Sequence, residues 1–329
     1  MTEQTGADSP TAHADRLGSA GQIASLLRSV DYLADGHACE VLRLAGQLAK
    51  PVLIEGPAGT GKTELAKSVA AMTGSRLIRL QCYEGLDEAK ALYEWNHAKQ
   101  LLRITAGRGG GSAGRVAASA GRVAADGGGP GAPRMAEWPD LESGIFTDDF
   151  LLTRPLLDAI RAVEPVVLLI DEVDRLDIEA EALLLEVLSD YQVSIPELGT
   201  VTARGIPLVF LTSNSSRDLS EALKRRCLYL YIDYPPAERE REIVRTRVPG
   251  ISEHLAGQIT AVLGSLRQLD IRQRPSVSQT LEWARALLEL GAEDLDAGLV
   301  AESLRLLLSY QSDIELAAVE LAGGRLPYA

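Results

Sequence analysis

The chain has 329 residues, 46% of them hydrophobic, and carries a formal net charge of −13 from 33 basic and 46 acidic residues. This length and hydrophobic content allow a large core and predict one large domain with a smaller one. The acidic balance disfavours a broad nucleic-acid face, although a local basic pore is compatible with it. Three widely spaced cysteines without a C-x-x-C pair disfavour a disulfide framework and a zinc site, and predict reduced thiols in the cytoplasm.

The N-terminal segment, residues 1–20, is polar and small and is predicted to be a disordered tail. Its beginning lacks the apolar core of a secretory signal, and no apolar run in the chain approaches the roughly 20 residues that cross a bilayer. We therefore expect a cytoplasmic protein without a membrane span. Apolar spacing then predicts one or two helices over residues 23–48, ahead of the first strand.

A glycine-rich motif follows the apolar run at 52–54 and precedes a segment, 64–72, with the composition and spacing of a helix. In this context glycines turn consecutive backbone N–H groups toward an anion, and the helix directs its positive end to the same point. The motif therefore predicts a phosphate site for ATP, formed by Gly56, Pro57, Ala58, Gly59, Thr60, Gly61, Lys62 and Thr63. Lys62 is expected to reach the β- and γ-phosphates, and Thr63 to place its hydroxyl on Mg²⁺.

Further apolar runs predict strands at 76–82, 165–172, 207–212 and 228–233, and a hairpin at 192–203. Helices are expected at 86–102, 154–160 and 178–188. Residues 106–136 are instead dominated by Gly, Ala and Arg and predict a flexible insertion. Strands that alternate with helices predict the α/β class, a three-layer domain with a parallel sheet, over residues 21–235.

Beyond residue 235 the strand signals stop. Helical patterns cover residues 238–248, 252–269, 278–290 and 296–322, with proline or glycine at breaks between them. The segment 236–329 is therefore predicted to be a separate, all-helical domain.

Two acids end the buried run at 165–172. At the carboxyl end of a strand, Asp171 can hold Mg²⁺ through water, and Glu172 can orient and polarise an attacking water. Two solvated acids at a strand end would look similar, but four aliphatic residues that lead directly into Asp-Glu, downstream of a phosphate loop, favour catalysis. Asn214 ends another strand and suits the same water or the γ-phosphate, although Asn is also a common turn former.

These motifs, in this order and followed by a helical region, resemble those of the AAA+ ATPases. Residues 56–63 resemble Walker A, residues 167–172 Walker B, residues 212–214 sensor 1, and residues 223–226 the arginine-finger region. More narrowly, residues 31–35 and 170–175 and the hairpin before Asn214 resemble the MoxR branch. Residues 80–87 and 92–96 are similar to ATPases that accompany carbon monoxide dehydrogenase and related molybdenum hydroxylases. The resemblance covers about residues 25–320, apart from the insertion.

The resemblance implies a ring of subunits, with a hexamer as the expected size, in which each lid moves with the nucleotide state. Arg225 or Arg226 would reach the γ-phosphate held by the neighbouring subunit, and the sequence does not separate the two. MoxR proteins commonly carry Ser-Pro-Arg at the sensor 2 position, whereas residues 273–276 read Gln-Arg-Pro-Ser. Sensor 2 is therefore left unassigned.

The resemblance also implies a function: a remodelling chaperone that acts on a client metalloenzyme, a molybdenum hydroxylase, together with a von Willebrand factor A (VWA) domain adaptor protein. Tyr83, Tyr93 and Trp95 are candidate client contacts, or else core aromatics. A DNA-acting AAA+ ATPase is an alternative that the acidic charge disfavours. A nucleotide-regulated scaffold with little turnover is another, and Glu172 counts against it.

Overall fold

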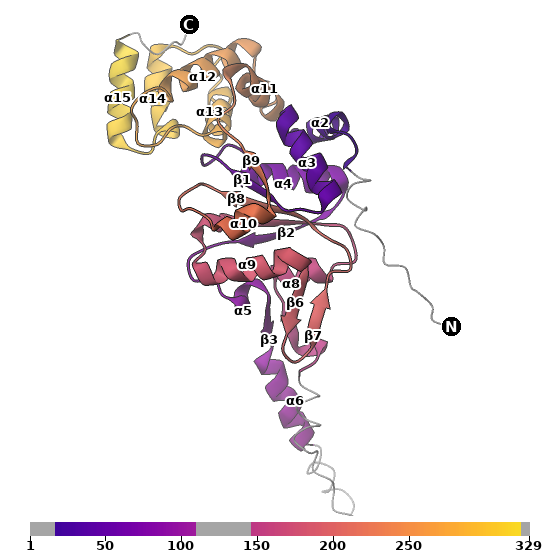
Figure 1. Ribbon diagram of the computed structural model, residues 1–329. Coiled ribbons are helices and arrows are strands. Elements are labelled where there is room, and N and C mark those ends of the chain that lie inside the picture. The colour runs from indigo at the N-terminus through magenta and orange to yellow at the C-terminus, as the bar shows by residue number, and fades with distance from the viewer. Residues whose placement is uncertain (1–16, 110–145, 324–329) are drawn as a thin grey trace, which may run out of the picture.

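The computed structural model describes residues 17–109 and 146–323 (Figure 1). Residues 1–16 of the predicted tail lie outside this range. Ser19, near the end of that tail, is the N-cap of helix α2 (Ala20–Ser29). The predicted insertion at 106–136 also lies outside it, except for residues 106–109, which end helix α6.

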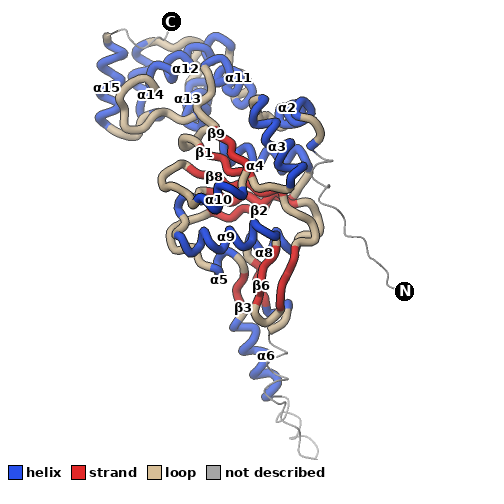
Figure 2. The backbone as a smooth tube through the Cα atoms, viewed as in Figure 1, coloured by secondary structure: helices blue, strands red, loops and turns tan. Residues whose placement is uncertain are grey.

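Five parallel strands form the central sheet, in the order β2-β5-β8-β1-β9 (Figure 2). They are β1 (Val52–Glu55), β2 (Arg76–Gln81), β5 (Val166–Asp171), β8 (Leu208–Ser213) and β9 (Leu228–Tyr231). The sequence-based strands and the α/β class are thus confirmed. Pairing aligns the carboxyl ends of β1, β5 and β8, since Glu55 lies beside Ser213 and Ile170 beside Leu211. Loops that leave these strands therefore meet at one edge of the sheet.

Helices cover both faces of this sheet, because its central strands are apolar on both sides. One face packs against α2 (Ala20–Ser29), α3 (Gly36–Leu48) and α4 (Lys62–Thr73). The other packs against α8 (Pro155–Arg161), α9 (Ile178–Asp190) and α10 (Glu221–Arg226). All six residues of β5 are buried, and each buried Val, Leu or Ile contributes about 1.5–3 kcal/mol of transfer free energy. The three-layer arrangement follows from this two-sided burial.

Two short antiparallel pairs lie outside the central sheet. The predicted hairpin forms from β6 (Gln192–Ile195) and β7 (Gly199–Thr202). The prediction of one helix over residues 86–102 is wrong. The segment contains α5 (Glu88–Ala91), β3 (Tyr93–Trp95) and the start of α6 (His97–Gly109). β3 pairs with β4 (Leu151–Thr153), which follows the short 3-10 helix η2 (Asp148–Phe150). Since this partner lies far along the chain, local periodicity could not reveal it.

The C-terminal region is helical, as predicted, and forms its own apolar core around the fully buried Trp283. Its helices are α11 (Ala237–Arg247), α12 (Glu253–Leu266), α13 (Val277–Glu289), α14 (Ala297–Leu307) and α15 (Gln311–Ala322). The single helix expected over 296–322 is two helices, because Leu308 adopts extended backbone and is buried. A buried ion pair joins Arg267 to Glu240, which also accepts from the Thr280 hydroxyl at 2.7 Å.

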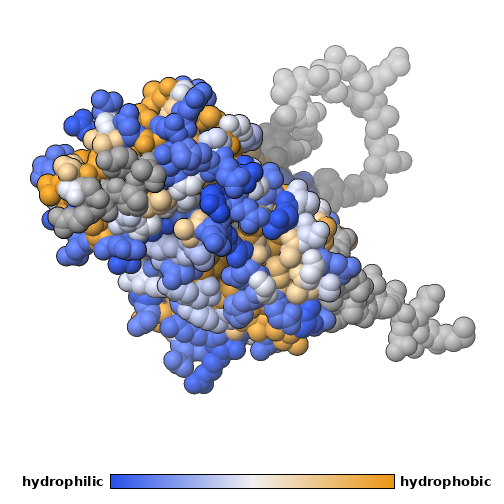
Figure 3. Space-filling view, turned by 90° about the horizontal axis from the view of Figure 1, so that it is seen from above, coloured by the Kyte–Doolittle hydropathy of each residue, from blue (hydrophilic) through white to orange (hydrophobic). Residues whose placement is uncertain are grey.

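The helical region lies beyond the β9 side of the sheet, whereas α6 extends away from the opposite side (Figure 1). Seen from above, hydrophilic side chains cover much of the molecule and apolar ones lie in separate groups (Figure 3). Among the described residues, none of the helices combines the length and apolar character that crossing a bilayer requires.

Candidate active site

The glycine-rich loop connects β1 to α4, as the sequence predicts. Gly56 and Gly59 both have positive φ, at 149° and 73°. A Cβ on Gly56 would lie 2.0 Å from the Ile232 carbonyl oxygen, and one on Gly59 would lie 2.4 Å from the Ser276 Cβ. These positions therefore require glycine, for conformation and for space. The loop delivers the chain to Lys62, the first residue of α4, so the positive end of that helix faces the loop.

Lys62 is buried, and its ammonium group donates to the carbonyl oxygens of Gly56 and Pro57 at 2.8 and 2.7 Å. It also donates to Oδ1 of Asn214 at 2.8 Å. Burial lowers the pKa of Lys62, and the carboxylates of Asp174 and Asp171 partly oppose this change. The loop lysine and the predicted sensor amide, 152 residues apart, therefore meet in the fold.

Asp171 is buried at the end of β5 and accepts hydrogen bonds on both oxygens. Its Oδ1 accepts from the Thr63 hydroxyl at 2.9 Å and from the Thr212 hydroxyl at 2.5 Å. Its Oδ2 accepts hydrogen bonds from Arg79, a residue that no sequence pattern singled out. Thr63 of the loop and Asp171 at the strand end, which the sequence predicts as partners of the same cation, are therefore in direct contact.

Glu172 follows Asp171 in the left-handed backbone region, with φ 58° and ψ 48°. Its backbone N–H donates to the Thr212 hydroxyl at 3.0 Å. Its Oε2 forms an ion pair with Nε of the exposed Arg175 at 2.6 Å. Glu172 lines a cavity of about 280 Å³ together with Lys62 and Asp171.

Oxygen donors at this site fit a magnesium ion. The Thr63 hydroxyl and the Asp171 carboxylate are hard ligands. The described residues contain no group of three or more His, Cys, Asp and Glu side chains that could hold a metal by themselves. This donor set suits a cation that is held largely by water and by the phosphates of a bound nucleotide.

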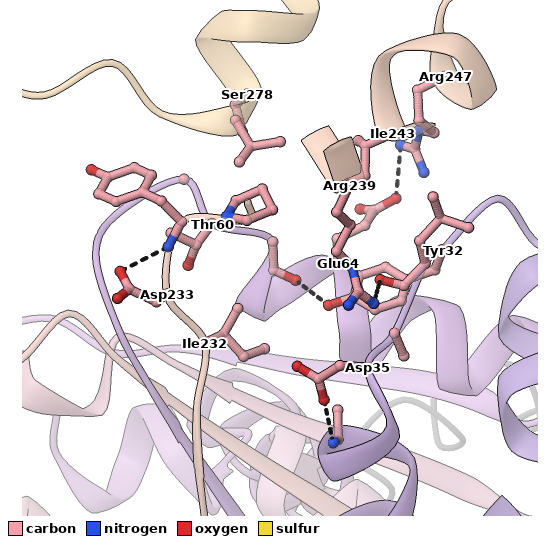
Figure 4. A pocket seen from close by; sticks show the side chains of 18 of the residues that line it. Tyr32, Asp35, Thr60, Glu64, Ile232, Asp233, Arg239, Ile243, Arg247 and Ser278 are labelled. Atoms are coloured by element: carbon pink, nitrogen blue, oxygen red, sulfur yellow. Dashed lines mark hydrogen bonds and ion pairs between the residues drawn. The ribbon is translucent and has the colours of Figure 1, made fainter. Parts of the chain in front are cut away.

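A second cavity, of about 410 Å³, adjoins the first and shares Gly59, Gly61 and Glu64 with it. Figure 4 shows it between the phosphate loop, the segment before α3 and helix α11. The Tyr32 hydroxyl donates to the Gly61 carbonyl at 3.4 Å, and Arg239 donates to the Leu33 carbonyl at 3.0 Å. Burial strongly raises the pKa of Tyr32, so the phenol stays neutral. The two cavities therefore meet at the phosphate loop, which lines both of them.

The helical region contributes to this site through several residues. Arg247 of α11 binds Glu64 of α4 at 3.0 Å, and the Ser278 N–H points to the Gly59 carbonyl at 3.4 Å. Arg274, in the segment where sensor 2 was left unassigned, lines a cavity with Pro57 of the loop. Sequence reasoning missed Tyr32, which lies in a run quoted for the family resemblance, and it had no signal for Arg239 beyond the start of a helix.

Arg225 and Arg226 end helix α10, and they differ in their contacts. The side chain of Arg225 is 81% exposed and pairs with the exposed Glu221 at 3.4 Å. Arg226 donates to the Ser189 hydroxyl at 2.7 Å and to the Ala222 carbonyl at 3.2 Å. In the part of the chain that the structure describes, neither arginine lines the two cavities at the phosphate loop.

Two buried acids fix the loop between Asn214 and α10. Oδ2 of Asp174 accepts from the N–H groups of Asn214 and Ser216 at 3.2 and 3.0 Å. Glu181 accepts from Ser220 N–H at 2.8 Å and from Arg217 at 2.9 Å. Burial alone would raise the pKa of Glu181, but these hydrogen bonds lower it below the ordinary value. The acids therefore connect the strand-end site to the helix that carries the arginines.

This fold, with its phosphate loop, strand-end acids and polar amide around one cavity, defines a P-loop nucleotide-binding protein. A family model described as "ATPase family associated with various cellular activities (AAA)" matches residues 52–233, more than half of the chain. The chain therefore belongs to the AAA ATPase family, which implies nucleotide binding with a divalent metal, and ATP hydrolysis.

Individual relatives are more distant. The chain is 40% identical over 83 residues to the ATP-dependent zinc metalloprotease FtsH of Acaryochloris marina, a match that covers 23% of this chain and spans 12% of that protein. Among solved structures, it is similar to a point mutant of Thermotoga maritima RuvB, with 19% identity, TM-score 0.44, and coverage of 82% and 69% of the two chains. It is also similar to the Thermotoga maritima RuvB Holliday junction branch migration motor, with 16% identity, TM-score 0.42, and coverage of 89% and 73%.

Proposed function

We propose that this chain is an ATP-hydrolysing chaperone of the MoxR type that remodels or matures a partner metalloenzyme. The observation that carries the hydrolytic part is the convergence of Lys62, Thr63, Asp171, Glu172 and Asn214 around one cavity. The MoxR part rests on the sequence resemblance. That resemblance also supports a VWA-domain adaptor protein and a molybdenum hydroxylase as partners. The three widely spaced cysteines support a cytoplasmic setting.

Each residue of the cavity has a role in this proposal. Lys62 exchanges its carbonyl partners for phosphate oxygens, and Asn214 then holds the γ-phosphate or the attacking water. Glu172 leaves Arg175 and orients that water. Thr63, and Asp171 through water, would hold Mg²⁺, which would supply positive charge to neutralise the phosphates.

The proposed assembly is a ring, with six subunits as the expected number. Arg225 is the better candidate for the arginine that acts on the neighbouring site, because its side chain is exposed and pairs with an acid that is itself exposed. Arg226 is held within its own subunit by Ser189. An arginine placed in trans would stabilise charge on the transferred phosphoryl group.

We further propose that residues 21–235 form the ATPase unit and residues 236–329 a lid that moves with the nucleotide state. Contacts such as Arg247 to Glu64 would transmit this motion. Tyr83 is exposed and remains a candidate client contact. The rings of Tyr93 and Trp95 instead pack edge to face, with 6.3 Å between their centroids. The net charge of −13 supports a protein client rather than a nucleic acid.

Hydrolysis is tested with the substitution Glu172→Gln. We expect the variant to bind ATP as well as the wild type does and to hydrolyse it about 10²–10⁴-fold more slowly, because the group that orients the water is lost. Glu179→Gln, which changes an exposed acid on α9, is the matched control and should keep the wild-type rate. Equal rates for wild type and Glu172→Gln would leave a nucleotide-regulated scaffold as the better proposal.

The proposed action of Arg225 on the site of the neighbouring subunit is tested by mixing two inactive variants. Arg225→Ala should lose activity while binding ATP normally, and Glu172→Gln should be inactive in its own site. When the two are mixed, some Arg225→Ala sites receive an intact arginine from a Glu172→Gln neighbour, so activity should return in part. Absence of recovery, or full activity of Arg225→Ala alone, would contradict the proposed role of Arg225. Arg226→Ala serves as the control.

A further inference from the structure

Arg79 binds the buried carboxylate that the proposed function assigns to the metal. It lies on β2, the edge strand next to β5, and its Nε and Nη2 are 3.1 and 2.5 Å from Oδ2 of Asp171. The Arg79 side chain is 48% exposed, whereas that of Asp171 is 5% exposed. Gln81, the register partner of Asp171, accepts a second hydrogen bond from Nη2 and orients the guanidinium.

Both oxygens of Asp171 therefore have hydrogen-bond partners within the protein. The Thr63 and Thr212 hydroxyls donate to Oδ1, and Arg79 covers Oδ2. A carboxylate attracts a divalent cation through its negative charge and its free lone pairs. A guanidinium at hydrogen-bond distance offsets the negative charge and occupies a lone pair, and its own positive charge repels the cation.

A second arginine on the same strand shows what an ordinary surface pair looks like. Arg76 is 43% exposed and binds Asp158 and Glu164, whose side chains are 40% and 54% exposed. Water and salt screen such pairs strongly. Arg79 differs because its partner is buried and belongs to the candidate metal site, so its charge acts on that site with less screening.

We propose that Arg79 is a positioning residue that competes with the divalent cation for Asp171, an inference that rests on the proposed function. While the site holds no cation, the guanidinium neutralises Asp171 and keeps it from repelling the phosphates of an incoming nucleotide. When the cation and nucleotide bind together, Arg79 releases Oδ2 and turns into the solvent that already surrounds half of its side chain. Arg79 therefore sets how strongly nucleotide affinity depends on the cation.

The test measures this dependence directly and requires no hydrolysis. The dissociation constant of a fluorescent ATP analogue is determined with excess MgCl₂ and with EDTA, and the ratio of the EDTA value to the Mg²⁺ value is compared between proteins. Arg79→Gln should raise this ratio about three- to tenfold, the range expected for the loss of a partly exposed charged pair. Affinity in Mg²⁺ should increase because the competitor is gone, and affinity in EDTA should decrease because Asp171 is left uncompensated.

Arg76→Gln is the matched control and should keep the wild-type ratio, since its partners lie outside the site. Arg79→Lys retains the positive charge and should stay closer to the wild type than Arg79→Gln does. Arg79→Met removes the charge as well, so it provides a second variant if Arg79→Gln does not fold and should raise the ratio in the same way. A ratio in Arg79→Gln that equals or falls below the wild-type value would overturn the inference. Failure of the wild type to bind the analogue in either buffer would instead contradict the proposed function.

Discussion

The substitution Gly59→Ala would show how firmly the C-terminal helical region packs on the phosphate loop. The φ of Gly59 is 73°, and an added Cβ would lie 2.4 Å from Cβ and 2.6 Å from Oγ of Ser276, the N-cap residue of α13. Left-handed backbone costs a residue with a Cβ about 1–2 kcal/mol. Overpacking adds about 1–3 kcal/mol. We therefore expect Gly59→Ala to lower the free energy of unfolding by about 2–5 kcal/mol.

Two comparisons separate these contributions. Gly74→Ala has a similar φ of 63° and open space around the new methyl group, so it should lose about 1–2 kcal/mol from backbone strain alone. Adding Ser276→Gly to Gly59→Ala removes both clashing atoms and should recover about 1–3 kcal/mol. The loss of the Ser276 cap side chain subtracts a few tenths of a kcal/mol from this recovery.

The assay is urea unfolding followed by circular dichroism, with nucleotide affinity measured alongside. Because the clash lies between the loop and Ser276 of the helical region, Gly59→Ala should also weaken nucleotide binding, and Ser276→Gly should partly restore it. If Gly59→Ala and Gly74→Ala lose the same free energy of unfolding and Ser276→Gly restores nothing, the helical region moves away from the loop at negligible cost. That result would refute the reasoning.

Three further predictions concern single charged groups. Lys62→Ala should weaken ATP binding, measured by titration calorimetry, about ten- to hundredfold, because a charged hydrogen bond is worth about 1.5–3 kcal/mol. Lys90→Ala, which changes a surface lysine, should leave the affinity for ATP unchanged. Glu181→Gln should lower the free energy of unfolding, measured with urea at pH 7, by about 1–3 kcal/mol. Since folding lowers the pKa of Glu181, this stability is present above its ordinary value of 4.5 and is lost as the pH falls through the lowered pKa, so wild type and variant should converge in acid. A constant difference down to about pH 3, below the ordinary pKa of a glutamate, would contradict this assignment. Glu240→Ala should lower the free energy of unfolding by about 3–5 kcal/mol, because it leaves Arg267 charged and nearly buried, and a loss below about 1 kcal/mol would show that the pair is well solvated.

Local patterns in the sequence were sufficient for most of the architecture. Continuous apolar runs identified β5 and β8, since strands buried on both faces have no polar side. Gly-x-x-x-x-Gly-Lys-Thr after such a strand identified the phosphate loop, because few residues other than glycine adopt its backbone conformations. Prolines and glycines marked the ends of α11 and α13. The prediction of a helix over residues 86–102 was wrong because β3 is stabilised by pairing with β4, which lies far along the chain.

By itself, the sequence determined which residue types could bind phosphate, hold a cation and activate water, because those chemistries depend on side-chain identity and short spacing. Only the tertiary structure decided which groups face one another: Lys62 bound to Asn214, Tyr32 against Gly61, and Arg79 on Asp171. These pairs join strands and loops that lie far apart in the chain, and their alignment depends on the parallel register of the sheet. Residue spacing along the chain carries no information about such register, so an exposed arginine on an edge strand looked like any other surface charge until β2 was paired with β5.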